Sequence, residues 1–278
     1  MINTINAMLT TLSDYVLSLL AGWPPLLTLV VISAVAGVLM TVVFRFTSPQ
    51  HALQRVAALS RAQVLAIKLF KDDTAGMFRS LGNVLRYTAL RLWYFLPPVM
   101  IMILPFVMLM SQLARWYEHR PLVPGDKAVV ELQLAPSAWS RYRNVALEPS
   151  EQIAVEIRPL RDEAEHTVYW RIRAIKGEPA TICWRLGSRK VDMRISLADD
   201  ERIPCAVDPR RAGVGWGDQL LHPGQPGFED HAPVRGIVVH YGSRSTPLFG
   251  LDVPWWLTFV VVSILAALLA RPVIKVTF

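Results

Sequence analysis

The residues whose chemistry could support catalysis or ligation are few. Cys183 and Cys205 are the two cysteines of the chain. An oxidising compartment would permit a disulfide between them, and two buried free thiols explain them equally well. The sequence contains no nucleophile elbow, phosphate loop or paired-acid motif, and the acidic run 199–201 is typical of a solvated turn. We therefore expect neither an enzyme nor a cofactor, and no metal site, because metal-ligand spacing is missing among His166, His222, His231 and His240.

A second chemical feature is the concentration of positive charge in residues 45–91. This segment carries eight basic and two acidic side chains, a net charge of +6, whereas residues 92–252 carry nineteen of each. Guanidinium and ammonium groups bind the phosphates of anionic lipid headgroups or of RNA. The predicted contact residues are Arg45, Arg55, Arg61, Lys68, Lys71, Arg79, Arg86 and Arg91.

Helical signals surround these basic residues. Ser48 can cap a helix, and Pro49 suits its first position. A turn-forming run at 71–74 then separates two amphipathic stretches. The segment 45–91 is therefore predicted to form a cytoplasmic helical hairpin, although a solvated connector without a partner has the same pattern. The predicted inward faces are Leu53, Val56, Ser60, Val64 and Ile67 in the first helix, and Met77, Leu81, Val84 and Thr88 in the second.

Three apolar runs flank the hairpin and complete a membrane architecture. They cover residues 24–44, 92–114 and 252–270, close to the length that a 30 Å hydrocarbon core requires. Tryptophan and tyrosine mark their ends, for example Trp23 and Trp116, as in the aromatic belts of membrane proteins. The sequence predicts three transmembrane helices.

The position of the positive charge predicts the orientation. Basic residues gather on the cytoplasmic side of a bilayer, so the hairpin and the tail 271–278 should be cytoplasmic. The N-terminus and residues 115–251 should then lie outside. Residues 1–23 are predicted to form an interfacial helix on the outer leaflet. We expect a multi-pass protein of the bacterial inner (plasma) membrane.

Polar residues and prolines within the spans suggest a recess in the membrane. Small or polar side chains recur in the first span, and prolines in the second remove backbone donors whose carbonyl partners need protein or water. Tight helix packing and a plain structural kink explain the same residues. The candidate recess residues are Ser33, Thr41, Pro97, Pro98 and Pro105.

Residues 115–251 change to a period of two. Short alternating runs separated by turn-forming residues predict an extracytoplasmic, all-β domain, most simply an antiparallel β-sandwich. Val207–Val234 is rich in proline and glycine and is predicted to be a long ordered loop. The expected strands are Lys127–Leu134, Gln152–Ile157, Thr167–Ile175, Ala180–Leu186, Val191–Leu197 and Gly236–Tyr241.

From Phe46 to Met110 the sequence resembles the YidC/Oxa membrane insertase superfamily. The likeness is to its small three-span branch, which includes the insertase subunit of the ER membrane complex and archaeal relatives. It is carried by the hairpin with its Lys71-Asp72-Asp73 turn and by the Leu96-Pro97-Pro98-Val99-Met100 run, with Pro105 further on. Two features differ from the family: no Arg or Lys lies within a span, and a β-domain separates the second and third spans.

The resemblance implies that the hairpin guides incoming hydrophobic client segments, with the ribosome as a further partner. A polar groove open to lipid would lower the insertion barrier. We therefore expect an insertase-like or chaperone-like protein that assists membrane-protein insertion or assembly and contacts the lipid bilayer. The alternative is a structural scaffold subunit of an envelope complex, whose β-domain binds an extracytoplasmic partner. Loss of function on deleting the hairpin, or on deleting residues 121–250, would separate the two.

Overall fold

The computed structural model describes the chain except for residues 1, 21, 70–73, 143, 149, 201–204, 214, 230–231, 245–246, 249–250, 275 and 277–278. The chain divides into two compact units. Met1–Thr28 and Val107–Trp255 form the first, which we call the sheet unit. Leu29–Phe106 and Trp256–Phe278 form the second, the helical unit.

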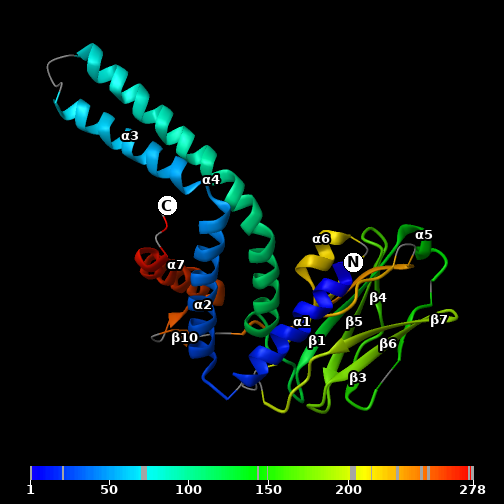
Figure 1. The fold of residues 1–278 in the computed structure, drawn as a ribbon. Helices are drawn as coiled ribbons and strands as arrows, with labels where there is room; N and C mark the ends of the chain where they lie inside the picture. The colour runs from blue at the N-terminus through cyan, green and yellow to red at the C-terminus, as the bar shows by residue number, and fades with distance from the viewer. Residues whose placement is uncertain are drawn as a thin grey trace. The chain divides into compact units, whose positions relative to one another are not determined.

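Four long helices build the helical unit (Figure 1). They are α2 Pro25–Thr47, α3 Gln50–Leu69, α4 Thr74–Tyr117 and α7 Trp255–Ile274. One end of each of α2, α4 and α7 belongs to the sheet unit. The helices α2, α4 (from Ala75) and α7 are each long and apolar enough to cross a membrane. Runs of leucine, valine and isoleucine without charge explain both properties. The prediction of three span-length helices is confirmed.

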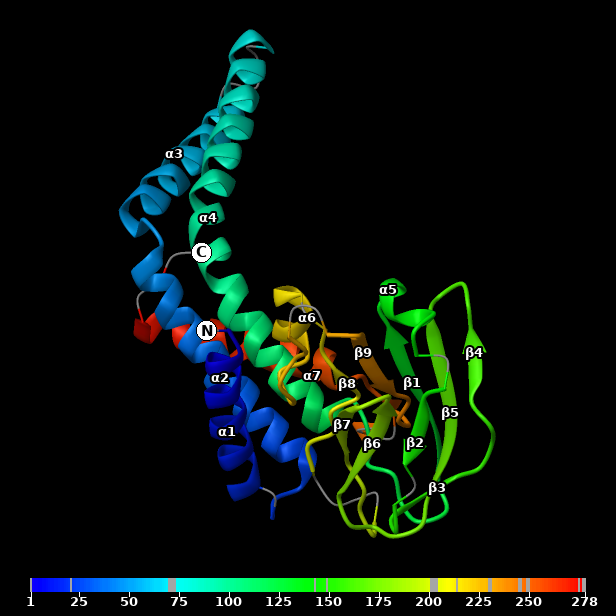
Figure 2. The same ribbon diagram turned by 90° about the vertical axis from the view of Figure 1, so that its right-hand side faces the viewer.

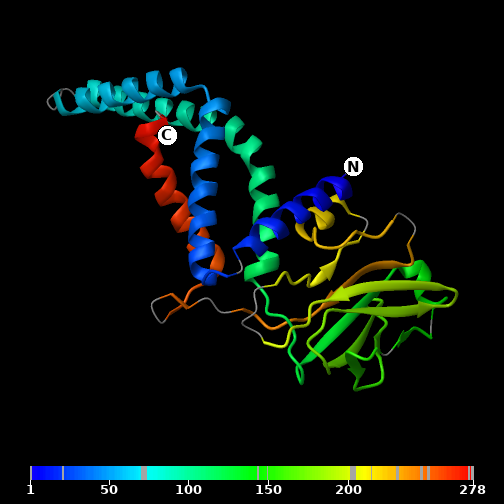
Figure 3. The same ribbon diagram turned by 60° about the horizontal axis from the view of Figure 1, so that its bottom comes forward.

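The predicted hairpin corresponds to α3 and the first part of α4, which lie side by side in all ribbon views (Figures 1–3). The turn predicted at Lys71–Asp73 lies outside the described residues. The sequence placed a boundary between residues 91 and 92, but α4 is one continuous helix there. Arginine and leucine both favour helix, so nothing at this boundary ends it. Pro97, Pro98 and Pro105 lie inside α4, whose ribbon changes direction along its length (Figure 2).

The inward faces of the hairpin are shifted from those predicted. Leu53 and Val56 are buried as expected, but Val64 is exposed. In α4, Leu81 and Thr88 are exposed, whereas Ser80 and Tyr87, one position earlier, are half-buried. Adjacent positions on a helix differ by only 100°, so a sparse apolar pattern leaves the exact face ambiguous.

The sheet unit contains the strands. The larger sheet is antiparallel with the strand order β3-β5-β1-β9-β8, and β4 also pairs with β5. A smaller sheet has the order β2-β6-β7. The strands β10 and β11 form a separate pair. The strands are β1 Lys127–Leu134, β2 Ala146–Glu148, β3 Ile153–Val155, β4 Leu160–Asp162, β5 Thr167–Ala174, β6 Ala180–Leu186, β7 Arg189–Ile195, β8 Arg210–Arg211, β9 Val234–Val239, β10 Pro247–Leu248 and β11 Leu251–Asp252.

One hydrophobic core joins the two larger sheets, which fits the predicted sandwich. Its members alternate along the strands, such as Val130 and Leu132 from β1 and Ile182 and Trp184 from β6. The rings of Trp170 and Trp184 meet edge to face across the sheets, 6.2 Å apart. Each of the six predicted strands has a counterpart. The strands β2, β4, β8, β10 and β11 were not predicted, and each has only two or three residues. β3 is equally short, but the alternation at 152–157 extends beyond its ends.

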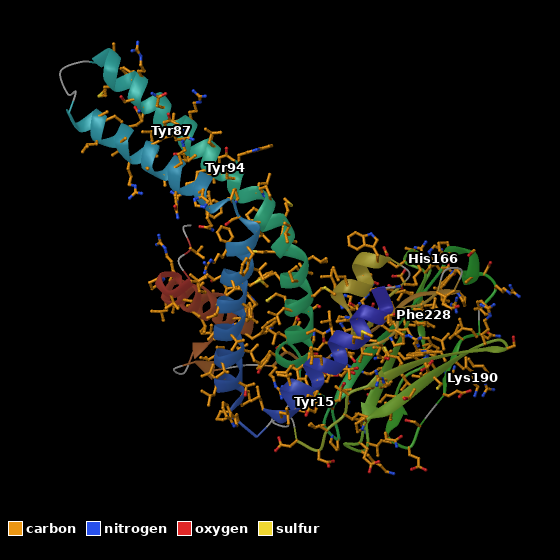
Figure 4. All side chains as sticks on the ribbon, viewed as in Figure 1. Tyr15, Tyr87, Tyr94, His166, Lys190 and Phe228 are labelled. Atoms are coloured by element: carbon orange, nitrogen blue, oxygen red, sulfur yellow. The ribbon has the colours of Figure 1, made fainter. Side chains whose placement is uncertain are left out.

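Three further helices belong to the sheet unit: α1 Ile2–Leu19, α5 Pro136–Trp139 and α6 Trp216–Leu221. The predicted loop 207–234 therefore contains α6 and the strand β8. The Asn6 amide of α1 donates to the Gln219 carbonyl of α6 at 2.7 Å. On its other side α1 leaves Met8, Leu12 and Tyr15 exposed; Figure 4 labels Tyr15.

Candidate functional site

Within the helical unit, α2, α4 and α7 line an open pocket of about 410 Å³, which we call the three-helix cavity. Two pairs of aromatic rings line it. The Phe44 and Phe95 rings of α2 and α4 lie 5.3 Å apart, and the Phe106 and Phe259 rings of α4 and α7 lie 6.2 Å apart. Its other lining residues include Met40, Val99, Met102, Ile103, Ile264 and Ala267.

A close helix contact borders this cavity. A Cβ built on Gly37 would lie 2.3 Å from the Ser263 carbonyl oxygen, so α2 and α7 approach as closely as they do because Gly37 has no side chain. The Ser263 hydroxyl donates to the Ser33 carbonyl at 3.0 Å and joins the same two helices. Small residues therefore bring α2 and α7 together beside the bulky residues that surround the cavity.

The lining presents hydrocarbon to its interior. Thr41 and Ser263 carry its hydroxyl groups, and each donates to a backbone carbonyl: Thr41 to Gly37 at 2.8 Å, and Ser263 to Ser33. No Arg or Lys is among the lining residues. The three-helix cavity suits an aliphatic or aromatic group and offers nothing that would hold an ion.

The three-helix cavity is apolar, unlike the water-accessible recess suggested by the sequence, and it is mostly lined by other residues than those predicted. Of the five candidates, Thr41 alone lines the three-helix cavity. Ser33 and Pro98 are buried among helices, and Pro97 and Pro105 are exposed. The prediction followed polarity and helix-breaking character, whereas the lining depends on which faces of α2, α4 and α7 meet. Phe44, Phe95 and Phe259 gave no signal in the sequence beyond general hydrophobicity.

The hairpin displays the predicted basic residues at its surface. Arg45, Arg55, Arg61, Arg79 and Arg86 are exposed and Arg91 is half-buried. The Lys68 side chain and the whole of Lys71 lie outside the described residues.

The structure also exposes large apolar side chains on the hairpin, which the sequence had assigned in part to its interior. On α4, Phe78, Leu81, Leu85 and Leu92 are 45–67% exposed. Their spacings of three, four and seven residues place them along one side of the helix. We call these four residues the hairpin stripe. Arg79 and Arg86 follow Phe78 and Leu85 directly, so the hairpin surface combines hydrocarbon with positive charge.

An ion-pair centre in the sheet unit was not anticipated. Arg115 is buried near the end of α4, and its guanidinium lies 3.0 Å from Asp14 of α1 and 2.5 Å from Asp208. The Trp116 indole donates to the same Asp14 carboxylate at 3.1 Å. Asp14 is the only charged residue among the first 44, which was the available signal. We call Arg115, Asp14 and Asp208 the arginine centre.

Beside the arginine centre lies a pocket of about 120 Å³ lined by His119 and His222, the histidine pocket. Burial lowers the pKa of both imidazoles, against the opposing influence of Glu118 on His119 and of Asp218 on His222. Both rings are therefore neutral near pH 7. Within the described part of the chain, no group of three His, Cys, Asp or Glu side chains is arranged to hold a metal ion.

The disulfide expected as one alternative does not form: Cys183 and Cys205 are both free. Cys205 packs against the core of the sheet unit. Cys183 alternates with the buried residues Ile182 and Trp184 along β6, so its side chain points to the opposite face of that sheet. Burial raises the pKa of the Cys205 thiol, and the nearby Arg244 partly opposes this. The thiols are therefore free, as in the alternative, but both are half-buried rather than buried.

Neither the scan against protein-family models nor the searches of curated proteins and of solved structures gave a match. The resemblance to the YidC/Oxa superfamily thus remains an interpretation of Phe46–Met110. A function for this chain has to be argued from the three-helix cavity, the hairpin and the sheet unit.

Proposed function

We propose that this protein is an insertase-like or chaperone-like membrane protein that assists the insertion or assembly of other membrane proteins. The observation that carries the proposal is the three-helix cavity, which lies among three helices long enough to span a membrane. An apolar group that packs into such a lining gains dispersion contacts with it. A hydrophobic segment of a client, packed against Phe95 and Phe259, supplies such contacts.

The lining of the three-helix cavity indicates which step of membrane-protein assembly the protein assists. Between helices in lipid, association depends on packing and small-residue contacts, because lipid tails are as apolar as leucine. The cavity offers packing surface and has no charge that would stabilise a polar segment in transit. We therefore place the protein's action in holding a client helix until it packs with its own partners, in contrast to the polar groove implied by the family resemblance.

The hairpin supports the same function. The hairpin stripe exposes hydrocarbon that an incoming apolar segment can cover, and the neighbouring Arg79 and Arg86 attract anionic lipid headgroups or ribosomal RNA. The positive-inside rule puts this surface on the cytoplasmic side of a bacterial inner membrane, where clients arrive. The exposed face of α1 fits an interfacial helix on the other side.

Photo-crosslinking at neighbouring residues tests the proposal. Ile103 and Leu104 are 47% and 55% exposed, and only Ile103 lines the three-helix cavity. A benzophenone amino acid placed at either position meets the same membrane depth from a different side of α4. We expect the benzophenone amino acid at position 103 to crosslink to newly made membrane proteins in cells. The same amino acid at position 104 should react mainly with lipid.

Two results bear on the interpretation. Filling the cavity with Ala267→Trp should remove the crosslinks from position 103 while the protein remains in the membrane. Equal client crosslinks from positions 103 and 104, unaffected by Ala267→Trp, would exclude the cavity as the client site.

The second candidate function is a scaffold whose sheet unit binds a partner. The observation that favours it is an open groove at the edge of the two sheets. Loss of function on disrupting that groove, with an intact three-helix cavity, would identify this role as the main one.

A further inference from the structure

The sheet unit contains a groove of about 710 Å³ between the edges of its two larger sheets, which we call the edge groove. β2 is the last strand on one side of the smaller sheet, and β3 is the last strand on one side of the larger sheet. Both strands border the groove: Ala146 and Leu147 line it from β2, and Ile153, Ala154 and Val155 from β3. The sandwich is thus open along the side where β2 ends the smaller sheet and β3 ends the larger sheet.

The edge groove reaches the hydrophobic core. Its lining includes Leu147, Ile153 and Trp170, which are core members at 2–8% exposure. Its other apolar members are far more accessible: Ile157 is 53% and Ile175 50% exposed. A groove with core residues at its base and exposed isoleucines at its rim has apolar area left to bury.

The edges themselves can accept another strand. Within the described strands, β2 pairs with β6 alone and β3 with β5 alone, although the Ile153 N–H of β3 donates to the Ser150 carbonyl at 3.4 Å. An edge strand carries backbone N–H and C=O groups that point outward without a strand partner, and an extended peptide satisfies them by pairing. β2 and β3 have three residues each, so a short added segment spans either of them.

The charge at the edge groove indicates which kind of segment it can bind. Glu156 lines the groove, but Lys127 at 3.5 Å and Arg173 already pair with it. Arg158 also lines the groove, is exposed, and has no ion pair among the residues that the structure describes. The unmatched charge at this apolar groove is therefore positive.

We propose that the edge groove binds an extended segment of a partner protein by strand addition. The segment alternates apolar and polar residues and carries an acidic residue opposite Arg158. Its apolar side chains cover Ile157 and Ile175, and its backbone pairs with the free edge of β2 or β3. Because the edge groove belongs to the sheet unit alone, the proposal does not depend on the insertase-like function.

The test uses the full-length protein in lipid nanodiscs and two fluorescein-labelled heptapeptides of alternating valine and threonine, one with a central aspartate and one with a central lysine. Fluorescence anisotropy should show saturable binding of the aspartate peptide. An exposed ion pair adjusts affinity only modestly, so the lysine peptide should bind about two- to fivefold more weakly. Arg158→Glu should reverse this preference.

Variants of the groove provide matched controls. Val155 and Val129 are valines with the same 36% exposure, and only Val155 lines the edge groove. Val155→Glu and Ile157→Glu should weaken binding by roughly tenfold or more, because they place a charge in the apolar contact. Val129→Glu should leave the affinity unchanged, and melting curves should show all three variants folded.

Three results would overturn the proposal. They are the absence of saturable binding by either peptide, equal weakening by Val129→Glu and Val155→Glu, or a dimer of the protein that Ile157→Glu converts to a monomer. The last result would assign the edge groove to a second copy of the chain.

Discussion

Arg115 links two distant segments of the sheet unit. It is buried with carboxylates on two sides, one from α1 and one from the segment before β8. Removing one member of a buried ion pair leaves an uncompensated charge, which typically costs about 3–5 kcal/mol. Since the Asp14 carboxylate is partly exposed and can be hydrated, the lower end of that range applies here.

We therefore expect Arg115→Ala to lower the stability of the sheet unit by about 3 kcal/mol, measured by chemical unfolding in detergent. Arg185→Ala is the matched control, because Arg185 pairs with Glu148 on the exposed surface. Such a surface pair contributes about 1 kcal/mol or less. Equal effects of the two substitutions would show that the arginine centre is not a stabilising contact.

The two half-buried histidines His119 and His222 make stability depend on pH. Burial lowers the pKa of His119 and His222, so the unfolded chain, with imidazole pKa values near 6.5, binds protons more readily than the folded one. Their contribution to stability is then complete above about pH 6.5 and is lost as the pH falls toward the lowered pKa values. The melting temperature should fall between pH 7.5 and 5.5, and less so in His119→Gln/His222→Gln. An unchanged pH dependence in the double variant would assign the effect to other groups.

Between elements, the contact of α2 with α7 depends on one glycine. Gly37→Ala places a methyl group 2.3 Å from the Ser263 carbonyl oxygen, so one helix must shift. Overpacking of this kind costs about 1–3 kcal/mol. Gly82 in α4 has open space around its Cα, and Gly82→Ala there should be neutral or stabilising by about 0.4–1 kcal/mol. Thermal unfolding in detergent measures the difference in stability between the two variants. A Gly37→Ala protein as stable as the wild type would mean that α2 and α7 pack more loosely than described.

The elements were predictable to the extent that they repeat a pattern. Long apolar helices such as α7 and alternating strands such as β1 and β6 could be located within a few residues. The strands β2 and β3 border the edge groove and have three residues each. β3 was predicted because the alternation at 152–157 extends beyond its paired residues, whereas no such run was recognised around β2. The three-helix cavity escaped prediction for another reason: Phe44 meets Phe95, and Phe106 meets Phe259, through the rotation of separate helices, which no local pattern encodes.

For the whole molecule, the distribution of charge predicts which parts face the cytoplasm. With the native cysteines replaced, we expect Lys190→Cys in the sheet unit to react with an impermeant thiol reagent in intact cells. Leu85→Cys on the hairpin should react only after the cells are opened. Both side chains are well exposed, so accessibility within the protein does not limit either reaction. The reverse labelling would contradict the orientation and, with it, the insertase-like function.

The arginine centre also sets an order of events during synthesis. Asp14 and Asp208 contact the same guanidinium but lie 194 residues apart in the sequence. A ribosome adds about 5–20 residues per second, so roughly 10–40 s pass between the translation of the two aspartates. The arginine centre can therefore form only after the strands β1 to β7 have been translated, and until then α1 lacks part of its packing within the sheet unit.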